Sequence, residues 1–531
     1  MTSRRRRGLD RVGLLLLGLL VGFGLTAAVL FWYVDRARTR VVEERVQVAL
    51  GLPDEAFELE EVEEDGSLRI RLRQVALLDQ AGDTVVSAPS AQARLIAASL
   101  SAETGPMVVD QVVVDRPYLR LVQRANGEWN YTDILKAEAA GAPVQVAGAD
   151  GEAKRPLAIR GMRIINGRAR IATPYRAPAK PNARFASLKQ PERVRTAAGV
   201  YTVRWLNNVQ ASLPLVRVGG AGGWRVEVAS LTANVTNPDT RIQQFAGWFE
   251  QDLDETLRFD IEALRTPNSA FDGEGRVRFA DAGPVFDLNL RAHPLSFADF
   301  GGMGLPLPPT GTAAFALNAR SQEGGRTLWR VTDARVAILD SRASGRVTVL
   351  TGPGIEPVFS DTRLSLDPLR LADLETLGYV DRLPLLGTVS GEIASLDALQ
   401  AGRGGPLRID LNAALTPRAN PGAAPSVLSA NGLIRYVPGE DPIRFSGLRV
   451  EADPLRVEHL ASLTDKPNPM LRGLLTGSAT LSGSAQDLRI DDGDLAYAVG
   501  DAPETVLRGL SGRFQMGETP RWQFSARAQP L

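Results

Sequence analysis

The chain contains no cysteine and only two histidines, His293 and His459. The missing cysteines exclude disulfides, cysteine-ligated zinc, iron–sulfur clusters and thiol nucleophiles, and two histidines are too few for a multi-histidine metal centre. An excess charge of one sign is also lacking, because 61 lysines and arginines balance 61 aspartates and glutamates. The composition therefore gives no support for nucleic-acid binding. We expect no cofactor, no metal and no nucleic-acid partner.

The short motifs that would indicate catalysis or nucleotide binding are incomplete. Ser390 lies in a Gly-Thr-Val-Ser-Gly segment, which lacks the spacing of a nucleophile elbow. The glycine-rich segments 219–223 and 301–304 lack the phosphate-loop lysine. The acidic segment 491–494 resembles the start of a calcium loop, but Ala502 stands where such a loop carries glutamate, so a hairpin turn is predicted there. We expect a protein that is not an enzyme and binds no nucleotide, with both histidines at the surface.

One long hydrophobic run stands near the N-terminus, at residues 12–34. As a helix it would be about 34 Å long, enough to cross a hydrocarbon core of about 30 Å. The expected interface anchors are the preceding arginines and the closing aromatic residues: Arg4, Arg5, Arg6, Arg7, Phe31, Trp32 and Tyr33. A cleavable signal peptide ending near Ala28 is the alternative, but the apolar run continues beyond that residue. The sequence favours an uncleaved anchor, with the N-terminus cytoplasmic and the bulk of the chain exported.

The rest of the chain is dominated by a period of two, which is typical of half-buried strands. Leu68, Ile70 and Leu72 alternate with three arginines, and similar runs recur to the end of the chain. Helical periodicity is nearly absent, with residues 242–257 the best candidate for an exception. Asn-Gly and Asp-Gly pairs at 126–127, 166–167 and 272–273 predict tight hairpins. Because so few helices are predicted, the apolar strand faces must pack on a second sheet, close on themselves, or hold another apolar substance.

A Pro-Leu step recurs at Pro294, Pro368 and Pro454, each time after an alternating strand. A glycine that is expected to open the next strand follows each step, at Gly311, Gly387 and Gly473. Since proline cannot donate to a strand ladder, we expect each step to mark the end of a strand. A further Pro-Leu pair stands at residues 530–531, which predicts that a fourth unit begins there and that the sequence is the N-terminal portion of a longer protein.

Several segments together resemble the AsmA-like superfamily of bacterial envelope proteins, closest in pattern to its TamB branch, the inner-membrane subunits of the translocation and assembly module. The likeness lies in the N-terminal anchor that leads directly into strands, in the segment from Arg116 to Leu121 followed by Asn-Gly-Glu-Trp-Asn at 126–130, and in the Ile-Ile-Asn-Gly turn at 164–167. The Pro-Leu repeats after residue 290 resemble the TamB branch. Trp129 and Asn130 are interpreted as a structural hairpin corner.

The resemblance implies a mainly β fold, with one N-terminal transmembrane helix followed by a long, curved, mostly antiparallel and repetitive β-sheet groove. The expected organisation is a cytoplasmic basic tail (1–11), the transmembrane helix (12–34), a neck (35–57), an N-terminal AsmA-like β region (58–136), a linker (137–156), a β-groove region (157–290) with an insertion (174–198), and TamB-like β repeats, incomplete at the C-terminus (291–531). The implied location is the inner membrane, as a single-pass protein with its bulk in the periplasm.

The function that the resemblance implies is outer-membrane biogenesis, in which phospholipid moves between the membranes along the apolar groove. The residues expected to line the groove are apolar positions of the alternating strands: Leu68, Ile70, Leu72, Phe286, Leu288, Leu290, Leu364, Leu366, Leu407, Ile409 and Leu411. Expected partners are the inner membrane, phospholipid and an outer-membrane barrel protein. Two alternatives stay open: a scaffold for outer-membrane protein or autotransporter assembly and secretion, and a passive anchored β spacer.

Overall fold

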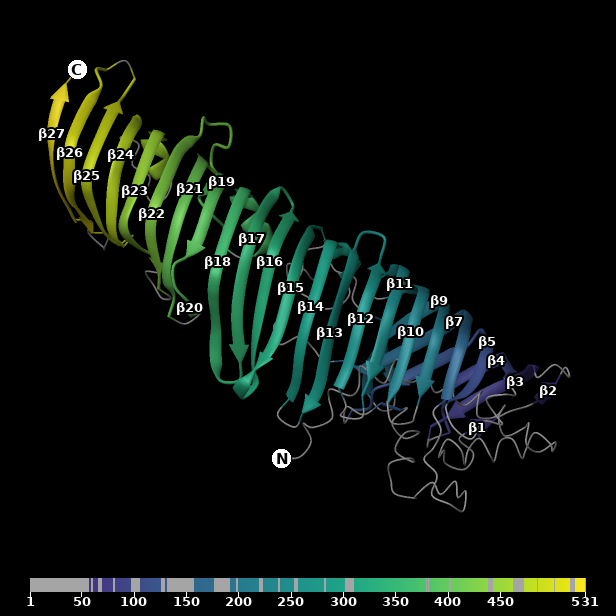
Figure 1. Ribbon diagram of the computed structural model, residues 1–531. Helices are drawn as coiled ribbons and strands as arrows, with labels where there is room; N and C mark the ends of the chain where they lie inside the picture. Colours follow the sequence, from purple (N-terminus) through teal and green to yellow (C-terminus); the bar gives the residue numbers. More distant parts are fainter. Residues whose placement is uncertain are drawn as a thin grey trace. The chain divides into compact units, whose positions relative to one another are not determined.

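The computed structural model is built almost entirely of strands (Figure 1). It describes residues 57–58, 61–64, 69–79, 82–96, 106–125, 129–130, 157–175, 192–196, 199–218, 223–236, 239–252, 256–280, 283–300, 310–378, 380, 382–400, 403–437, 443–461, 472–484, 486–500, 502–515 and 521–530. The chain divides into two compact units near residue 307. Unit 1 holds the described residues up to 300, and unit 2 holds those from 310. The expectation of a mainly β protein is confirmed.

Unit 1 is a mixed sheet. Its elements are β1 (Phe57–Glu58), β2 (Glu61–Glu64), β3 (Arg69–Leu78), β4 (Thr84–Leu95), β5 (Met107–Asp115), β6 (Tyr118–Val122), β7 (Leu157–Pro174), β8 (Glu192–Thr196), β9 (Gly199–Val218), β10 (Trp224–Val235), β11 (Thr240–Gln251), β12 (Thr256–Arg265), β13 (Ala270–Ala280), β14 (Gly283–Ser296) and the short 3-10 helix η4 (Phe297–Phe300). From β3 each strand pairs with the next in sequence, with two exceptions. Strands β5 and β6 both lie between β4 and β7. Strand β8 pairs only with the start of β9, and β9 pairs with β7. Only the pairs of β5 and β6 with β7 are parallel among these described strands.

Strands β5 and β6 are two halves of one interrupted strand. Met107 lies opposite Leu157 and Tyr118 opposite Arg168, so both halves keep the same register on β7. The break is at Pro117, which has no N–H, and at Arg116, whose φ of 46° bends the backbone. Hydrogen bonds from the Arg116 N–H to the Ile165 carbonyl (2.7 Å) and from the Arg168 N–H to the Pro117 carbonyl (2.8 Å) bridge it. The interruption therefore changes the strand direction without ending the sheet.

Unit 2 is an antiparallel sheet in which almost every strand pairs with its neighbours in sequence. Its elements are β15 (Thr312–Gln322), η5 (Glu323–Gly325), β16 (Arg326–Ile338), β17 (Ser341–Gly352), β18 (Ile355–Arg370), α5 (Leu371–Leu377), β19 (Leu385–Ser395), β20 (Leu399–Gln400), β21 (Gly405–Pro417), β22 (Ser426–Tyr436), β23 (Ile443–Arg456), α6 (Val457–Ala461), β24 (Leu474–Ser484), β25 (Asp487–Ala498), β26 (Thr505–Gln515) and β27 (Arg521–Pro530). The two-residue strand β20 pairs with β18, and β19 pairs directly with β21. Figure 1 shows the strands of this unit bowed along their length.

Several glycine signals were interpreted wrongly as hairpin turns. The pair at 166–167 lies inside β7, where Asn166 has a φ of 54°, and the pair at 272–273 lies inside β13. The acidic segment 491–494 likewise lies inside β25, with a φ of 51° at Asp492. In each case the residue with positive φ makes a bulge or kink within a continuing strand, an alternative use of the same backbone freedom. The pair at 126–127 lies outside the described residues.

Other expectations about elements have mixed outcomes. The helical candidate at 242–257 is wrong, because residues 240–251 form β11 and 256–265 form β12. Pairing of β11 with strands on both sides outweighs its weak helical pattern. The expected insertion 174–198 includes a real strand, β8, and the predicted anchor (12–34), neck (35–57) and linker (137–156) lie outside the described residues, apart from residue 57.

The Pro-Leu steps do end strands, as predicted. Strands β14, β18 and β23 end two residues after Pro294, Pro368 and Pro454, and a short helical turn follows each. The turns are η4, α5 and α6. Gly311 and Gly473 directly precede β15 and β24, whereas Gly387 is the third residue of β19.

A buried serine holds each of these strand ends. Ser269, Ser341 and Ser426 accept a hydrogen bond, in each case at 2.9 Å, from the backbone N–H two residues after the repeat proline. Each hydroxyl also contacts a side chain of the following helical turn: Asp299 (2.8 Å), Asp373 (2.6 Å) or His459 (2.8 Å). We refer to these three arrangements as strand-end latches 1, 2 and 3. The prediction of a surface position for His459 is wrong, since its ring closes latch 3 and is 3% exposed; His293 is exposed, as predicted.

Candidate functional site on the apolar face

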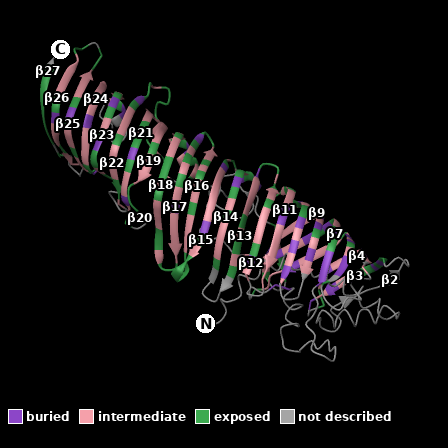
Figure 2. Cartoon of the chain, in the orientation of Figure 1, coloured by how far each residue is buried: buried purple, intermediate pink, exposed green. Residues whose placement is uncertain are grey.

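An unbroken row of apolar side chains crosses unit 1 from β3 to β14. Each member lies directly opposite the next in a paired strand, so all of them lie on the same face of the sheet. The row is Leu72, Ala91, Val114, Ile164, Ala211, Leu231, Phe245, Leu264, Phe271 and Ala292. Its first three members are buried, whereas Leu231, Phe245, Leu264 and Phe271 are half-buried. Figure 2 shows the same trend, with buried residues more frequent in the strands up to β10 than in later ones.

A second apolar row crosses unit 2 from β15 to β24. Its members are Ala313, Val336, Ala343, Leu366, Gly391, Leu411, Ala430, Val450 and Ala479, one from each of nine strands. All but Ala313 and Ala479 are half-buried. All described strands of unit 2 belong to one sheet, and Figure 1 shows no further layer of described elements over it, with α5 and α6 at strand ends. Within those residues, therefore, this face has no second layer.

The adjacent positions of the same strands form a polar row on the opposite face. The polar row of unit 2 is Arg335, Ser344, Ser365, Glu392, Asp410, Asn431, Arg449, Thr480 and Asp491. In β21 the polar positions are exposed, while the neighbouring apolar positions are half-buried or buried. From β16 to β24 the sheet of unit 2 thus separates an apolar face from a polar one.

The residues expected to line a groove fall on these apolar faces. In unit 1, Ile70 and Leu72 are each 1% exposed, and Phe286, Leu288 and Leu290 are half-buried at alternate positions before Ala292. In unit 2, Leu366 and Leu411 are members of the row itself. Leu364, Leu407 and Ile409 occupy parallel rows on the same face, since Leu364 and Ile409 both lie opposite Ile393. Their exposure differs, from 36% for Leu364 to 6% for Ile409, and Leu68 lies outside the described residues.

Sequence reasoning missed most of the row members, because a row depends on register. Four neighbouring strands of the unit 1 sheet, β5, β7, β9 and β10, break their burial alternation at matching positions, through a bulge or kink at Gln111, Gly161, Pro214 and residues 229–230. At each bulge two successive residues point away from the apolar face, so Val109 and Val112 are both buried although their spacing is odd. A strict period of two places Val112 on the wrong face. The only sequence signal was the pair of apolar residues three positions apart.

Glycines allow the strands to bend at the apolar row. Gly391 has a φ of 124°, and a Cβ at this position would collide with the Asp410 carbonyl oxygen of β21. This backbone conformation is closed to other residues. Elsewhere the missing side chain is replaced from the neighbouring strands: the ring of Phe259 and the Leu288 side chain meet over Gly275. Kinked glycines covered by neighbouring apolar groups are a known means of curving a sheet without leaving holes.

An apolar cavity of about 100 Å³ opens on this face beside the break between β5 and β6. Val114 and Ile164 of the unit 1 row form part of its wall, and Pro117 lies at the break itself. Leu119 and Ala169, which lie opposite each other in β6 and β7, form another part. The change of strand direction at Pro117 thus leaves a hollow in the apolar surface, with Tyr118 and Arg168 also in its lining.

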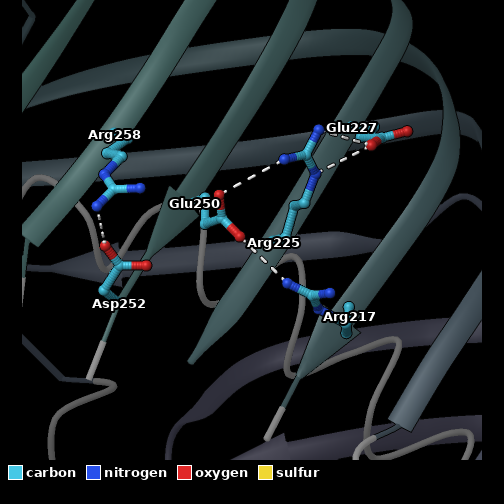
Figure 3. Close-up of polar contacts among 6 residues, drawn as sticks. All are labelled: Arg217, Arg225, Glu227, Glu250, Asp252 and Arg258. Carbon is cyan, nitrogen blue, oxygen red and sulfur yellow. Dashed lines mark hydrogen bonds and ion pairs between the residues drawn. The ribbon is translucent and has the colours of Figure 1, made fainter. Parts of the chain in front are cut away.

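On the polar face of unit 1, ion pairs join the three neighbouring strands β9, β10 and β11 (Figure 3). Glu250 of β11 lies between Arg217 (3.1 Å) and Arg225 (3.5 Å), and Arg225 also pairs with Glu227 at 2.9 Å. Arg258 pairs separately with Asp252 at 2.8 Å. Because successive strand residues point to opposite faces, Phe249 lies on the apolar side of the same strand. These ion pairs therefore hold six charged side chains on the face opposite the apolar row.

Trp129 and Asn130 have a structural position next to β6. Asn130 is buried, its side-chain oxygen accepts from the Val122 N–H, and its amide nitrogen donates to the Arg120 carbonyl, both at 2.9 Å. Trp129 forms an isolated bridge with Gln123. The buried amide thus bonds the backbone of β6 as the peptide group of a neighbouring strand would, which supports the interpretation of a structural corner.

The membrane-interface residues proposed from the sequence, Arg4 to Arg7 and Phe31 to Tyr33, lie outside the described residues. In the part of the chain that is described, no helix combines the length and the apolar character needed to span a membrane, and no group of acidic or histidine side chains is arranged to hold a metal ion. Comparison with protein-family models, with curated proteins and with solved structures found no match to this chain.

Proposed function

We propose that the chain carries phospholipid between membranes, with the acyl chains lying along the apolar face of its sheet. The observation that carries this proposal is the unit 2 row, in which nine neighbouring strands each place an apolar residue on one face and most of these residues are half-buried. A self-sufficient sandwich would bury such residues against a second sheet.

The energetic reason is the cost of exposing acyl chains to water. That cost is about 0.8 kcal/mol for each methylene group, so a lipid leaving one membrane needs continuous apolar contact to reach another. A row that runs perpendicular to the strands gives this contact. Neighbouring strands are about 4.8 Å apart, so an acyl chain that leaves one strand already touches the next. The expected curved groove would form where the glycine kinks bend the strands around this row. No chemical step is required, so we propose a carrier that is not an enzyme.

The membrane setting of this proposal follows the resemblance to the AsmA-like superfamily. In that setting residues 12–34 would form the inner-membrane anchor, the arginine cluster would lie in the cytoplasm, and the strands would lie in the periplasm. The TamB branch would add an outer-membrane barrel protein as a partner.

A second function, a scaffold for outer-membrane protein assembly, stays open and would use a strand of unit 2 as its template. Strand β27 pairs with β26, and among the described strands β27 has no other neighbour. An edge strand of a sheet can pair with a strand of another protein, the mode by which a scaffold could template strands of an outer-membrane protein. A passive anchored spacer would need neither the apolar row nor this edge.

Photo-crosslinking at adjacent positions separates these functions. A benzophenone amino acid is placed at Leu366 on the apolar row or at Ser365 on the polar row, in cells that express the full chain. Both positions are half-buried and belong to β18, so they differ mainly in the face that they occupy. Lipid adducts, detected by mass spectrometry of the purified chain, are expected at Leu366 and not at Ser365.

The same pair is repeated at Leu411 and Asp410 of β21, and a third probe is placed at Gln523 in β27. Equal lipid labelling of both faces, or none on either, would contradict lipid carriage. Protein adducts at Gln523 without lipid at Leu366 would favour the scaffold, and no adducts at any position would favour the spacer.

A further inference from the structure

The three strand-end latches share one hydroxyl geometry but differ in the group that closes them. In latches 1 and 2 the serine hydroxyl donates to a carboxylate, from Asp299 or Asp373. In latch 3 the corresponding position, five residues after the repeat proline, is His459. Aspartate carries its charge when it accepts this hydrogen bond, whereas histidine accepts it only as the neutral ring. The exchange therefore alters the conditions under which the latch can close.

The hydrogen bonds around His459 are best satisfied by the neutral ring. The Ser426 oxygen already accepts from the Arg456 N–H at 2.9 Å, so its hydrogen is free to be donated to Nδ1 at 2.8 Å. A further hydrogen bond joins the ring to the backbone of Leu415, which lies directly opposite Ser426 in the neighbouring strand. The network is complete when Nδ1 has no proton and the other ring nitrogen carries one.

Latch 3 consequently ties three strands together through one imidazole. Leu415 belongs to β21, Ser426 is the first residue of β22, and Arg456 is the last residue of β23. His459 and Ser426 are 3% and 1% exposed. Protonation of Nδ1 would take away the acceptor of the buried hydroxyl and place a positive charge in this interior, and both changes oppose the closed latch.

The surroundings of the ring act mainly against protonation. Burial is the largest influence and lowers the pKa of His459, the Glu458 carboxylate raises it, Arg456 lowers it, and the hydrogen bond to the Leu415 backbone raises it. The Leu415 backbone of β21 and the Ser426 hydroxyl of β22, which both bond to the ring, do not titrate. The net pKa is below the ordinary value of 6.5. The stabilisation that the neutral ring gives is therefore present above pH 6.5 and is lost as the pH falls below it.

Latch 1 responds in a lower pH range. Burial, the largest influence on the Asp299 carboxyl, raises its pKa, but hydrogen bonds from Thr266, Ser269 and Asn268 outweigh it and hold the pKa below 3.8. The carboxylate accepts from the Ser269 hydroxyl at 2.8 Å and from the Asn268 amide at 3.1 Å. This latch keeps its charge, and its hydrogen bonds, at pH values where a histidine begins to protonate.

We infer that latch 3 is a pH-sensitive joint, which releases the end of β23 from β21 and β22 in mildly acidic surroundings while the aspartate latches 1 and 2 stay closed. The strands affected include Leu411 and Val450 of the unit 2 row. Acidification would therefore loosen the apolar face at one place in the repeat. The inference does not depend on what the apolar face binds.

Hydrogen–deuterium exchange of the full chain tests this joint. Exchange is measured at pH 7.5 and pH 5.5, corrected for the intrinsic pH dependence of amide exchange, and compared between peptides from β22 and β23 and peptides from β17 and β18. One proton can change the opening equilibrium by at most about tenfold for each pH unit below the ordinary histidine pKa of 6.5. Since pH 5.5 lies about one unit below that value, we expect protection at the latch 3 ends to fall by up to about tenfold. Protection at the ends of β17 and β18 should not change.

Substitutions assign the effect to one ring. His459→Asp, which copies the other latches, and His459→Asn should both remove the pH dependence. His293→Gln, at the other histidine of the chain, should leave it intact. Loss of protection at pH 5.5 that persists in both His459 variants would overturn the inference, as would unchanged protection in the wild type. Because latches 2 and 3 are compared within the same wild-type molecule, equal losses at both would also overturn it, even if neither variant folds.

Discussion

At the scale of single residues, Ser341 shows how much one hydroxyl can hold. It is buried, accepts from the Arg370 N–H at 2.9 Å and contacts the Asp373 carboxylate at 2.6 Å. Ser341→Ala would leave two buried polar groups without this partner, so we expect the free energy of unfolding to fall by about 1–3 kcal/mol. Urea denaturation followed by circular dichroism measures the change.

The control for that substitution lies three residues further along the same strand. Ser344 is on the polar row and exposed, so Ser344→Ala should alter stability by less than about 0.5 kcal/mol. Equal effects of the two substitutions would show that the latch contributes no more than an exposed hydroxyl.

A second residue-scale prediction concerns charge on the apolar face. From the sequence, Ile409→Asp is expected to impair lipid passage more than stability, because an open groove could hydrate the new carboxylate. The structure places Ile409 at 6% exposure, where a charge has little access to water, so this substitution should instead unfold part of the sheet. Leu366→Asp, at a half-buried position, is the variant expected to keep the fold and to lose lipid adducts at the Leu411 probe. Circular dichroism and adduct yield, measured on both variants, separate these outcomes; retained folding of Ile409→Asp would contradict the burial argument.

At the scale of elements, Gly391 is the position where strand curvature is most easily tested. Its φ of 124° and the closeness of the Asp410 carbonyl leave no room for a Cβ. Gly391→Ala must therefore straighten β19 locally or part it from β21, which should destabilise unit 2 by at least about 1–3 kcal/mol. Gly422→Ala is the control, because Gly422 lies in a turn where a Cβ meets only one side-chain atom, 4.0 Å away. Thermal unfolding of the two variants gives the comparison, and matched midpoints would contradict the proposed kink.

How far the sequence determines these elements is clear from individual strands. The alternation at Ile70 and Leu72 correctly predicts a buried face, and the repeat prolines correctly predict strand ends. Bulges are different, because whether the backbone freedom of a residue such as Asn166 makes a turn or a bulge depends on the strand that lies beside it. The latches were missed for the same reason: Ser426 and His459 are far apart in sequence, and only the pairing of β22 with β23 brings them together.

At the scale of the whole molecule, the division near residue 307 predicts that unit 2 is stable by itself. Its strands pair with near neighbours in the sequence, so folding requires few long loops to close. A fragment of residues 308–531 should therefore give the same hydrogen-exchange protection in β16 to β25 as the full chain. Loss of protection throughout the fragment would mean that unit 2 depends on residues outside it.

The proposed lipid path makes its own prediction at this scale, because a row of sites in series behaves differently from a set of independent sites. If acyl chains must pass every strand in turn, one charge on the row should block transfer as fully as two, whereas independent sites would lose activity in proportion. Leu366→Asp in β18 and Val450→Asp in β23 are suitable single variants, since both residues are half-buried members of the unit 2 row. Transfer of a fluorescent phospholipid between donor and acceptor vesicles by the full chain would be measured for each single variant and for the double variant. We expect three similarly low rates, near the rate without protein, and a normal rate for Ser365→Asp on the polar row. Partial losses of rate in the single variants that become larger in the double variant would contradict a single continuous path along the apolar face. A low rate for Ser365→Asp would contradict it as well.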